Sequence, residues 1–388
     1  LLMQRMADCN SLASMNTQQQ RMKLVTIAAL VALTGIAASS RPLIGNGTAD
    51  QAHAVAQLAP LYAVPKFVAS GPAFDAKKVM AGKSILSIPG PTSNPWYEQG
   101  LTAMKSVASM VGYSYSFVPN SGERAQYQKG METGIASKVS LIDLFAGPSP
   151  SDLTKEIAAA KAAGTIVAVS HNFGVGDAVP KDVANLPVDF ARAGRLLADW
   201  VISKDTTAHV LVLVSDELAS TASLRSGIAS EFEQYGGPNI KFTFSNVAIA
   251  NWSTGLKPAV EAAFKADPKT SYVICIYDSM SEFVVPAVAA AKMEGKAKII
   301  GFNGTPFVLD MIRAGKVEMA VGECLGWTGY AIADAEMRLI GGMGTVSDMN
   351  IPLRIFTKDN AAEAGIPATF SKGYGDSFKS DYRKLWGF

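Results

Sequence analysis

From about residue 82 onward, short apolar runs alternate with longer amphipathic stretches. The runs are rich in β-branched residues, which is typical of strands buried on both faces of a parallel sheet. We expect strands at Ser84–Pro89, Tyr115–Val118, Val139–Phe145, Thr165–Ser170, His209–Ser215, Lys241–Val247, Ser271–Tyr277 and Lys298–Phe302.

The stretches between these runs have the spacing of helices with one apolar face. In Tyr97–Val111, for example, Leu101, Met104, Ala108 and Val111 fall on one side. Strands and helices that alternate at this spacing predict parallel α/β units. The further helices are expected at Leu153–Ala163, Ala191–Ser203, Leu224–Tyr235, Gly255–Ala266 and Ser281–Glu294.

The units form two runs of about four, separated by a break at residues 172–189. The break contains Gly174, Gly176, Pro180 and Pro187, so we expect a loop there. The predicted fold class is therefore α/β, with two doubly wound parallel-sheet lobes. Residues 55–81 form a proline-containing lead-in segment to which the pattern assigns no structure.

Composition and charge narrow the range of partners. The 388 residues allow two domains, and 48% apolar residues are sufficient for their cores. Lys and Arg total 35 against 33 Asp and Glu. Residues 1–54 hold four basic and two acidic residues, so the remainder has 35 − 4 = 31 basic and 33 − 2 = 31 acidic residues. A neutral chain without a basic stripe argues against a nucleic-acid partner.

Leu24–Ala37 is an uncharged run that follows Arg21 and Lys23. A basic end, a short apolar run and then small residues are typical of a cleavable secretory signal. The run is shorter than the ~20 residues of a membrane helix. We expect cleavage after the alanine at 37, 38 or 54, assign residues 1–54 to upstream residues and signal, and predict a periplasmic product. The alternative is a buried N-terminal helix.

The sequence predicts no metal, no cofactor and no catalytic residue. It has no C-x-x-C pair, and its three histidines are scattered. Cys275 and Cys324 lie in apolar runs and are expected to be buried thiols in strands, with a disulfide bridge as the less favoured alternative. No G-x-S-x-G motif and no close pair of carboxylates supports an enzyme.

Aromatic, amide and hydroxyl side chains recur directly after the predicted strands, where charges are few. Ligands of open α/β sheets bind beyond the carboxyl ends of the strands. This mix of side chains suits a neutral polar ligand with apolar ring faces. The segments concerned are residues 90–97, 146–149, 170–173, 216–225, 249–252, 277–279 and 303–306.

Two of these segments resemble motifs of the periplasmic sugar-binding proteins of the ribose-binding type. Asn94–Tyr97 (Asn-Pro-Trp-Tyr) resembles that family's Asn-Pro-aromatic-aromatic opening, and Gly301–Pro306 (Gly-Phe-Asn-Gly-Thr-Pro) resembles its Gly-Phe-Asp-Gly-Thr-Pro turn. Val188–Trp200 resembles the segment in which the chain first crosses between lobes. The resemblance extends from residue 82 to about residue 357.

The resemblance implies two lobes joined by a hinge of three crossings, at Pro187–Asp189, Glu323–Cys324 and Asn350–Pro352. The N-terminal lobe is then expected to comprise residues 82–187 and 324–350, and the C-terminal lobe residues 188–323 and 351–388. The family implies a monomer that closes on a small ligand between the lobes and delivers it to the permease of an ABC importer.

Ten residues are expected to contact that ligand, with Trp96 and Trp252 on opposite sides of its ring. Eight of them, all except Ser170 and Tyr277, have a structural alternative, such as a helix start, a turn, a core position, a hinge hydrogen bond or a surface position. The ten are Asn94, Trp96, Tyr97, Ser170, His171, Arg225, Trp252, Tyr277, Asn303 and Glu323.

Departures from the family pattern concern the ligand. Ser170 and His171 stand where a ribose-like site has an Asp-Arg pair, Tyr277 stands for Asn, and Asn303 stands for Asp. Fewer charged partners for hydroxyl groups change which ligand is accepted. We expect a sugar, a polyol or a sugar-like cyclic compound. The alternatives are a non-sugar cyclic ligand and a sensory role, in which the protein presents its ligand to a membrane receptor or kinase.

Overall fold

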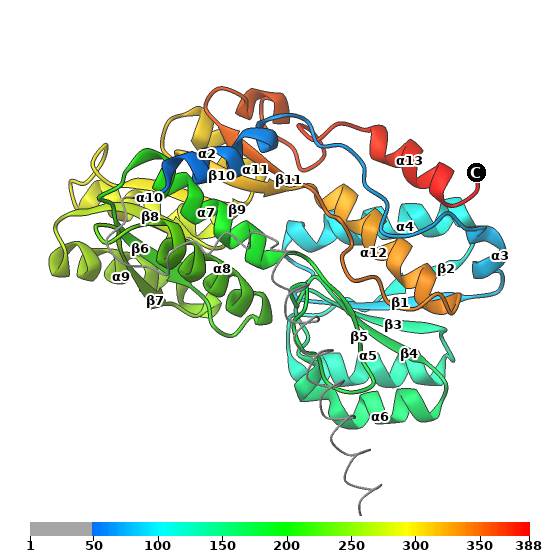
Figure 1. The fold of residues 1–388 in the computed structure, drawn as a ribbon. Coiled ribbons are helices and arrows are strands. Elements are labelled where there is room, and N and C mark those ends of the chain that lie inside the picture. The colour runs from blue at the N-terminus through cyan, green and yellow to red at the C-terminus, as the bar shows by residue number, and fades with distance from the viewer. Residues whose placement is uncertain (1–48) are drawn as a thin grey trace, which may run out of the picture. The chain divides into compact units, whose positions relative to one another are not determined.

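Two β-sheets organise residues 49–388, which are the residues that the computed structural model describes (Figure 1). The predicted secretory run, Leu24–Ala37, lies outside them. The first sheet has the order β2-β1-β3-β4-β5, and all its pairings are parallel. Its strands are β1 (Ser84–Pro89), β2 (Ser114–Phe117), β3 (Leu141–Phe145), β4 (Ile166–Ser170) and β5 (Ala184–Leu186).

The second sheet has the order β11-β10-β9-β8-β6-β7. Its first five strands in sequence repeat the order of the first sheet, and only β11 runs antiparallel to its neighbour β10. The predicted pair of doubly wound lobes is thereby confirmed. The strands are β6 (His209–Val214), β7 (Lys241–Asn246), β8 (Thr270–Cys275), β9 (Lys298–Asn303), β10 (Met319–Glu323) and β11 (Leu353–Thr357).

The loop expected at residues 172–189 is wrong in one respect, because it contains the short strand β5. Ala184 and Asn185 are only half-buried at this edge of the sheet. An edge strand of three residues has no apolar run by which the sequence could reveal it.

Helices cover both sheets and begin and end where local chemistry allows. In α4 (Pro95–Val111), Asn94 accepts a hydrogen bond from the backbone N–H of Trp96, and Gly112 adopts the left-handed conformation that ends the helix. The remaining helices that cover the sheets are α5 (Arg124–Ala136), α6 (Thr154–Ala162), α7 (Phe190–Lys204), α8 (Ala219–Tyr235), α9 (Trp252–Ala266), α10 (Ser281–Ala290), α11 (Pro306–Arg313) and α12 (Leu325–Ile340).

The chain passes between the two sheets three times. It leaves the first sheet after β5 and enters α7, which packs against α8 of the second lobe. It leaves the second sheet after β10 and enters α12, which packs against α4 of the first lobe. It then returns to the second sheet as β11.

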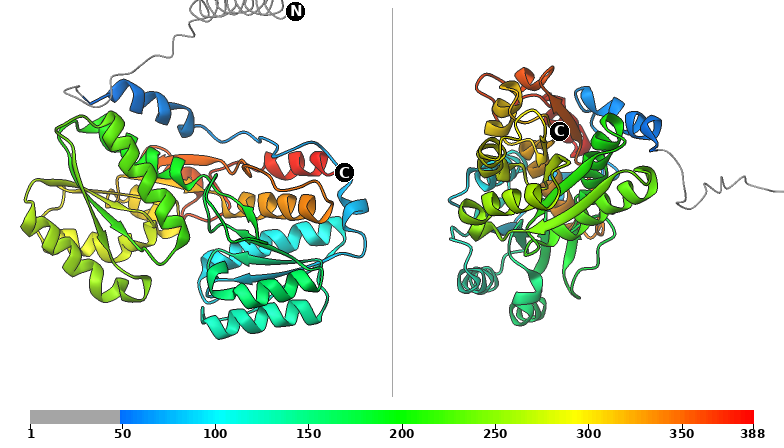
Figure 2. Two further views of the ribbon diagram at one scale, coloured as in Figure 1. Left: turned by 60° about the horizontal axis from the view of Figure 1, so that its bottom comes forward. Right: turned by 90° about the vertical axis from the view of Figure 1, so that its left-hand side faces the viewer.

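Besides the three crossings, segments near the N-terminus and the C-terminus also contact the lobes. Near the N-terminus, α2 (Gln51–Leu58) packs against α7, whereas α3 (Ala76–Met80) packs against α12 (Figure 2). Near the C-terminus, residues after β11 lead to α13 (Ser377–Leu385), which packs on α12. A cut after Ala54 would remove the first half of α2, in which Ala54 itself is fully buried.

Cys275 and Cys324 are buried free thiols, as predicted. Cys275 ends β8, and Cys324 directly follows β10. None of the helices in the described part of the chain combines the length and the apolar character that crossing a bilayer demands.

Candidate functional site

The carboxyl ends of the strands hold unusual backbone conformations. Ala146 follows β3 and His171 follows β4, with φ values of 50° and 53°, and Asn303 at the end of β9 has a φ of 124°. Residues other than glycine rarely adopt positive φ, and such positions concentrate at functional sites. The positive φ values therefore indicate that the strand ends form a candidate functional site.

Trp96 and Tyr97 begin α4 and lie against the end of β3. The half-buried Trp96 ring stacks on Phe145, with 5.7 Å between centroids, and meets the His171 ring edge-on at 4.9 Å. The Tyr97 hydroxyl donates to the carbonyl of Ala146 at 2.8 Å. The Trp96 ring is thus held in place while part of its surface stays exposed.

His171 and Glu323 join the two lobes. His171 Nε2 lies 2.8 Å from Glu323 Oε1 at the end of β10, and both side chains are buried. Asn303 Nδ2 donates to the same oxygen at 3.3 Å. The other oxygen, Glu323 Oε2, is buried and has no hydrogen-bond partner among residues 49–388. A buried acceptor without a partner is costly, so this oxygen is available to a donor on a ligand.

A second group lies at the ends of β6 and β8. The Tyr277 hydroxyl lies 2.8 Å from Ser220 Oγ and 2.9 Å from Thr221 Oγ1. Half-buried Trp252 stacks on Tyr277 at 6.5 Å, and its Nε1 donates to Ser215 Oγ at 3.0 Å.

The Tyr97 phenol responds to a residue of the second group. Its pKa is raised by burial first, and then by the phenols of Tyr127 and Tyr277. Tyr97 belongs to the N-terminal lobe and Tyr277 to the C-terminal lobe. Together with the contact between His171 and Glu323, this indicates that the strand ends of the two lobes face a common region.

Three of the ten predicted residues are engaged elsewhere. Asn94 is exposed and caps α4. Ser170 is fully buried, and its hydroxyl donates to Asp143 at 2.7 Å. The Arg225 guanidinium lies over the Phe244 ring and 3.4 Å from Asp216. The other seven, namely Trp96, Tyr97, His171, Trp252, Tyr277, Asn303 and Glu323, form the two groups.

Below the first group lies a buried polar network that the sequence did not indicate. Asp143 accepts from Ser170 and Ser87, and Tyr115 donates to Ser87. Burial raises the pKa of Asp143 to about 7 and raises that of the neighbouring Glu336 well above its usual value. The network fixes β1, β3 and β4 beneath the strand ends.

Tyr374 in the C-terminal segment is a further residue that the sequence did not indicate. Its hydroxyl is buried beside the backbone of Gly304 and Gly322, directly before Glu323. Burial raises the pKa of this hydroxyl most, and the ionisable groups of Cys324, Glu323 and Asp278 raise it further. The C-terminal segment therefore packs against the end of β10.

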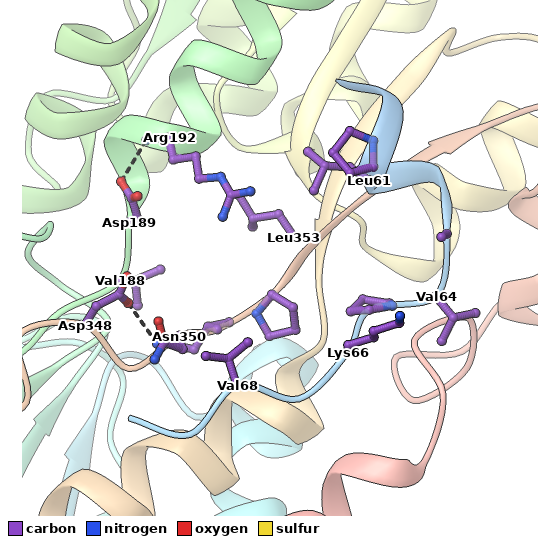
Figure 3. Close-up of a pocket in the computed structure, with 15 residues that line it drawn as sticks. Leu61, Val64, Lys66, Val68, Val188, Asp189, Arg192, Asp348, Asn350 and Leu353 are labelled. Carbon is purple, nitrogen blue, oxygen red and sulfur yellow. Dashed lines mark hydrogen bonds between the residues drawn. The ribbon is translucent and has the colours of Figure 1, made fainter. Parts of the chain in front are cut away.

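A cavity of about 500 Å³ lies at the hinge, between the N-terminal segment and two of the crossings (Figure 3). Lys66 and Val68 line it from the N-terminal segment, and Val188, Arg192 and Asn350 line it from the crossings. None of the ten predicted residues lines it. Within residues 49–388, the one group of at least three metal-ligating side chains that lie close together includes none of the ten either.

Comparison with known proteins identifies the family. Residues 85–343 match the family model described as a periplasmic binding protein domain. The chain belongs to the periplasmic binding protein family. This match confirms the family that the resemblance of Asn94–Tyr97 and Gly301–Pro306 to known motifs indicated. At the level of sequence, no curated protein matches the chain.

Solved structures of this family share the fold. A Caulobacter myo-inositol binding protein bound to myo-inositol has 18% identity and a TM-score of 0.62, covering 74% of this chain and 97% of its own. A solute-binding protein from Actinobacillus succinogenes 130z with bound D-allose has 18% identity and a TM-score of 0.60, covering 72% and 99%. A 5-methylthioribose transporter solute-binding protein from Thermotoga lettingae has 17% identity and a TM-score of 0.61, covering 81% and 94%.

Proposed function

We propose that this periplasmic binding protein captures a small neutral polar ligand between its lobes and delivers it to an ABC importer after export to the periplasm. The ligand class is a sugar, a polyol or a sugar-like cyclic compound. The observation that carries the proposal is Glu323 Oε2, a buried carboxylate oxygen without a partner at the junction of the lobes.

The chemistry around this oxygen suits hydroxyl groups. A carboxylate accepts short, strong hydrogen bonds, and a ligand hydroxyl is a donor that can fill the vacant position. Asn303 and His171 already fix the carboxylate from both lobes, so its orientation needs no rearrangement. A ligand donor there would contact both halves of the protein at once.

Two half-buried rings supply apolar surface. Trp96 belongs to the first group and Trp252 to the second. Aromatic faces bind the C–H faces of sugar-like rings, whereas hydroxyl groups are recognised at ring edges. We propose that these indoles lie on opposite sides of the ligand, and that Tyr97 and Tyr277 contribute hydroxyl contacts.

The bound ligand would stabilise closure because neither lobe alone completes its contacts. A ligand shifts a conformational equilibrium only by its differential affinity for the two states. The lobes are joined by three crossings, and the importer would recognise the closed form. Family members bind solutes, which supports binding without chemical conversion.

A thermal-shift screen followed by calorimetry tests the proposal. The panel comprises pentoses, hexoses, 5-methylthioribose, myo-inositol and other polyols, with small cyclic acids as the contrasting class. We expect at least one neutral polyhydroxy compound to bind saturably at one site per chain and to be recovered unchanged. Binding confined to the charged acids, or conversion of the compound to product, would overturn the proposal.

A further inference from the structure

Three metal-ligating side chains lie close together in the region where α2 packs on α7. Figure 2 shows α2 beside the C-terminal lobe. His53 comes from α2, Asp199 from α7 and Glu231 from α8. His53 Nε2 lies 2.8 Å from Glu231 Oε1, and one ligand atom of each residue lies within 4.8 Å of the others. Three helices that are distant in sequence thus supply one site.

The two carboxylates are buried, with Asp199 1% and Glu231 4% exposed. Asp199 Oδ1 has no hydrogen-bond partner among the described residues. Burial, then the charge of Glu231 and a side-chain hydrogen bond with Glu231, raise the pKa of Asp199 to about 8, which the nearby Arg195 offsets only in part. Two buried carboxylates side by side need a compensating positive charge, either a cation or a shared proton.

The imidazole is oriented toward this pair. The His53 ring stacks on Tyr235 at 3.6 Å between centroids, with the planes 9° apart. Contacts that fix ring orientation are typical around histidine ligands. The His53 side chain is 16% exposed, so the site has access to solvent.

We propose that His53, Asp199 and Glu231 bind one divalent transition-metal ion of the Zn²⁺ class, with water completing its coordination. One imidazole with two carboxylates is a donor set suited to Zn²⁺ and related ions, whereas Ca²⁺ and Mg²⁺ prefer oxygen ligands alone. The ion neutralises the buried carboxylates and fastens α2 to the C-terminal lobe. This inference is independent of the proposed ligand between the lobes, and it requires that the exported chain keeps His53, with cleavage after the alanine at 37 or 38 rather than at 54.

Zinc titration of the chelator-treated full chain tests the site. Calorimetry is expected to show one ion per chain, and saturating Zn²⁺ is expected to raise the thermal midpoint by about 5 °C. His53→Gln and Glu231→Gln are each expected to weaken binding at least tenfold. The matched control is His209→Gln, which removes a partly buried histidine–aspartate pair outside the cluster and should leave binding unchanged.

X-ray absorption of the wild-type zinc complex gives a readout that needs no variant. We expect one imidazole nitrogen, with oxygen atoms as the other ligands. The absence of a saturable site, binding that survives His53→Gln in a folded variant, or sulfur or several imidazoles around the zinc would overturn the inference. The carboxylates would then hold a shared proton instead.

Discussion

Replacing Glu323 with Gln is expected to weaken ligand binding roughly 30-fold, which corresponds to about 2 kcal/mol. The substitution keeps the shape of the side chain but removes the charge from the carboxylate that His171 and Asn303 both contact. It also replaces a hydrogen-bond acceptor, Oε2, which has no partner in the part of the chain that the structure describes. Calorimetry with the compound that gives the largest thermal shift measures the effect.

The matched control is Asp216→Asn. Asp216 also lies just beyond a strand, but its side chain is 45% exposed and pairs with Arg225. We expect this control to change affinity by less than threefold. Equal affinities for the wild type and Glu323→Gln, with both proteins folded, would show that Glu323 is only a hinge residue.

Trp386→Ala is expected to lower the free energy of unfolding by about 3–5 kcal/mol, because a large buried ring leaves a cavity. Trp386 is 1% exposed and stacks on Tyr330 of α12 with 5.8 Å between centroids. Its Nε1 donates to Asp334 Oδ1 at 2.7 Å, so the substitution also removes a buried donor. Guanidinium-induced unfolding followed by circular dichroism measures the loss.

Val55→Ala is the control for this stability experiment. Val55 lies in the other terminal segment, where its side chain is 53% exposed, and we expect a change below about 0.5 kcal/mol. A loss below about 1 kcal/mol for Trp386→Ala would mean that α13 contributes little to the stability of the N-terminal lobe.

The periodic core of both lobes could be predicted from the sequence. The eight predicted strands correspond to β1–β4 and β6–β9, with ends that differ by up to two residues. Parallel strands buried on both faces give continuous apolar runs, and amphipathic helices give a 3.6-residue period. Asn94–Tyr97 could be placed at a strand end for the same reason.

The terminal segments could not be predicted, because tertiary contacts rather than periodicity bury their side chains. α2 and α3 are short, and most residues between them have no regular secondary structure. Tyr374 is buried beside β10, and Trp386 is buried against α12. The sequence around these two residues has no pattern that indicates which element each one contacts. For the same reason, the sequence could not predict that His53 contacts Asp199 and Glu231, which are more than 140 residues away in the chain.

The sequence also could not predict the direction in which a side chain points at the end of a strand. Ser170 and His171 are neighbours, yet the serine faces the buried Asp143 whereas the histidine reaches Glu323. Successive side chains on a strand point to opposite faces, and the positive φ of His171 reorients the chain directly after β4. The sequence identifies the strand end but not which of the two faces the other lobe.

Small-angle X-ray scattering with and without a saturating concentration of the best compound from the screen tests capture between the lobes most directly. Closure on the ligand predicts a smaller radius of gyration in the saturated sample, and Glu323→Gln predicts that a higher concentration is needed for the same change. Superimposable scattering curves at a concentration that calorimetry shows to be saturating would contradict capture of the ligand between the lobes.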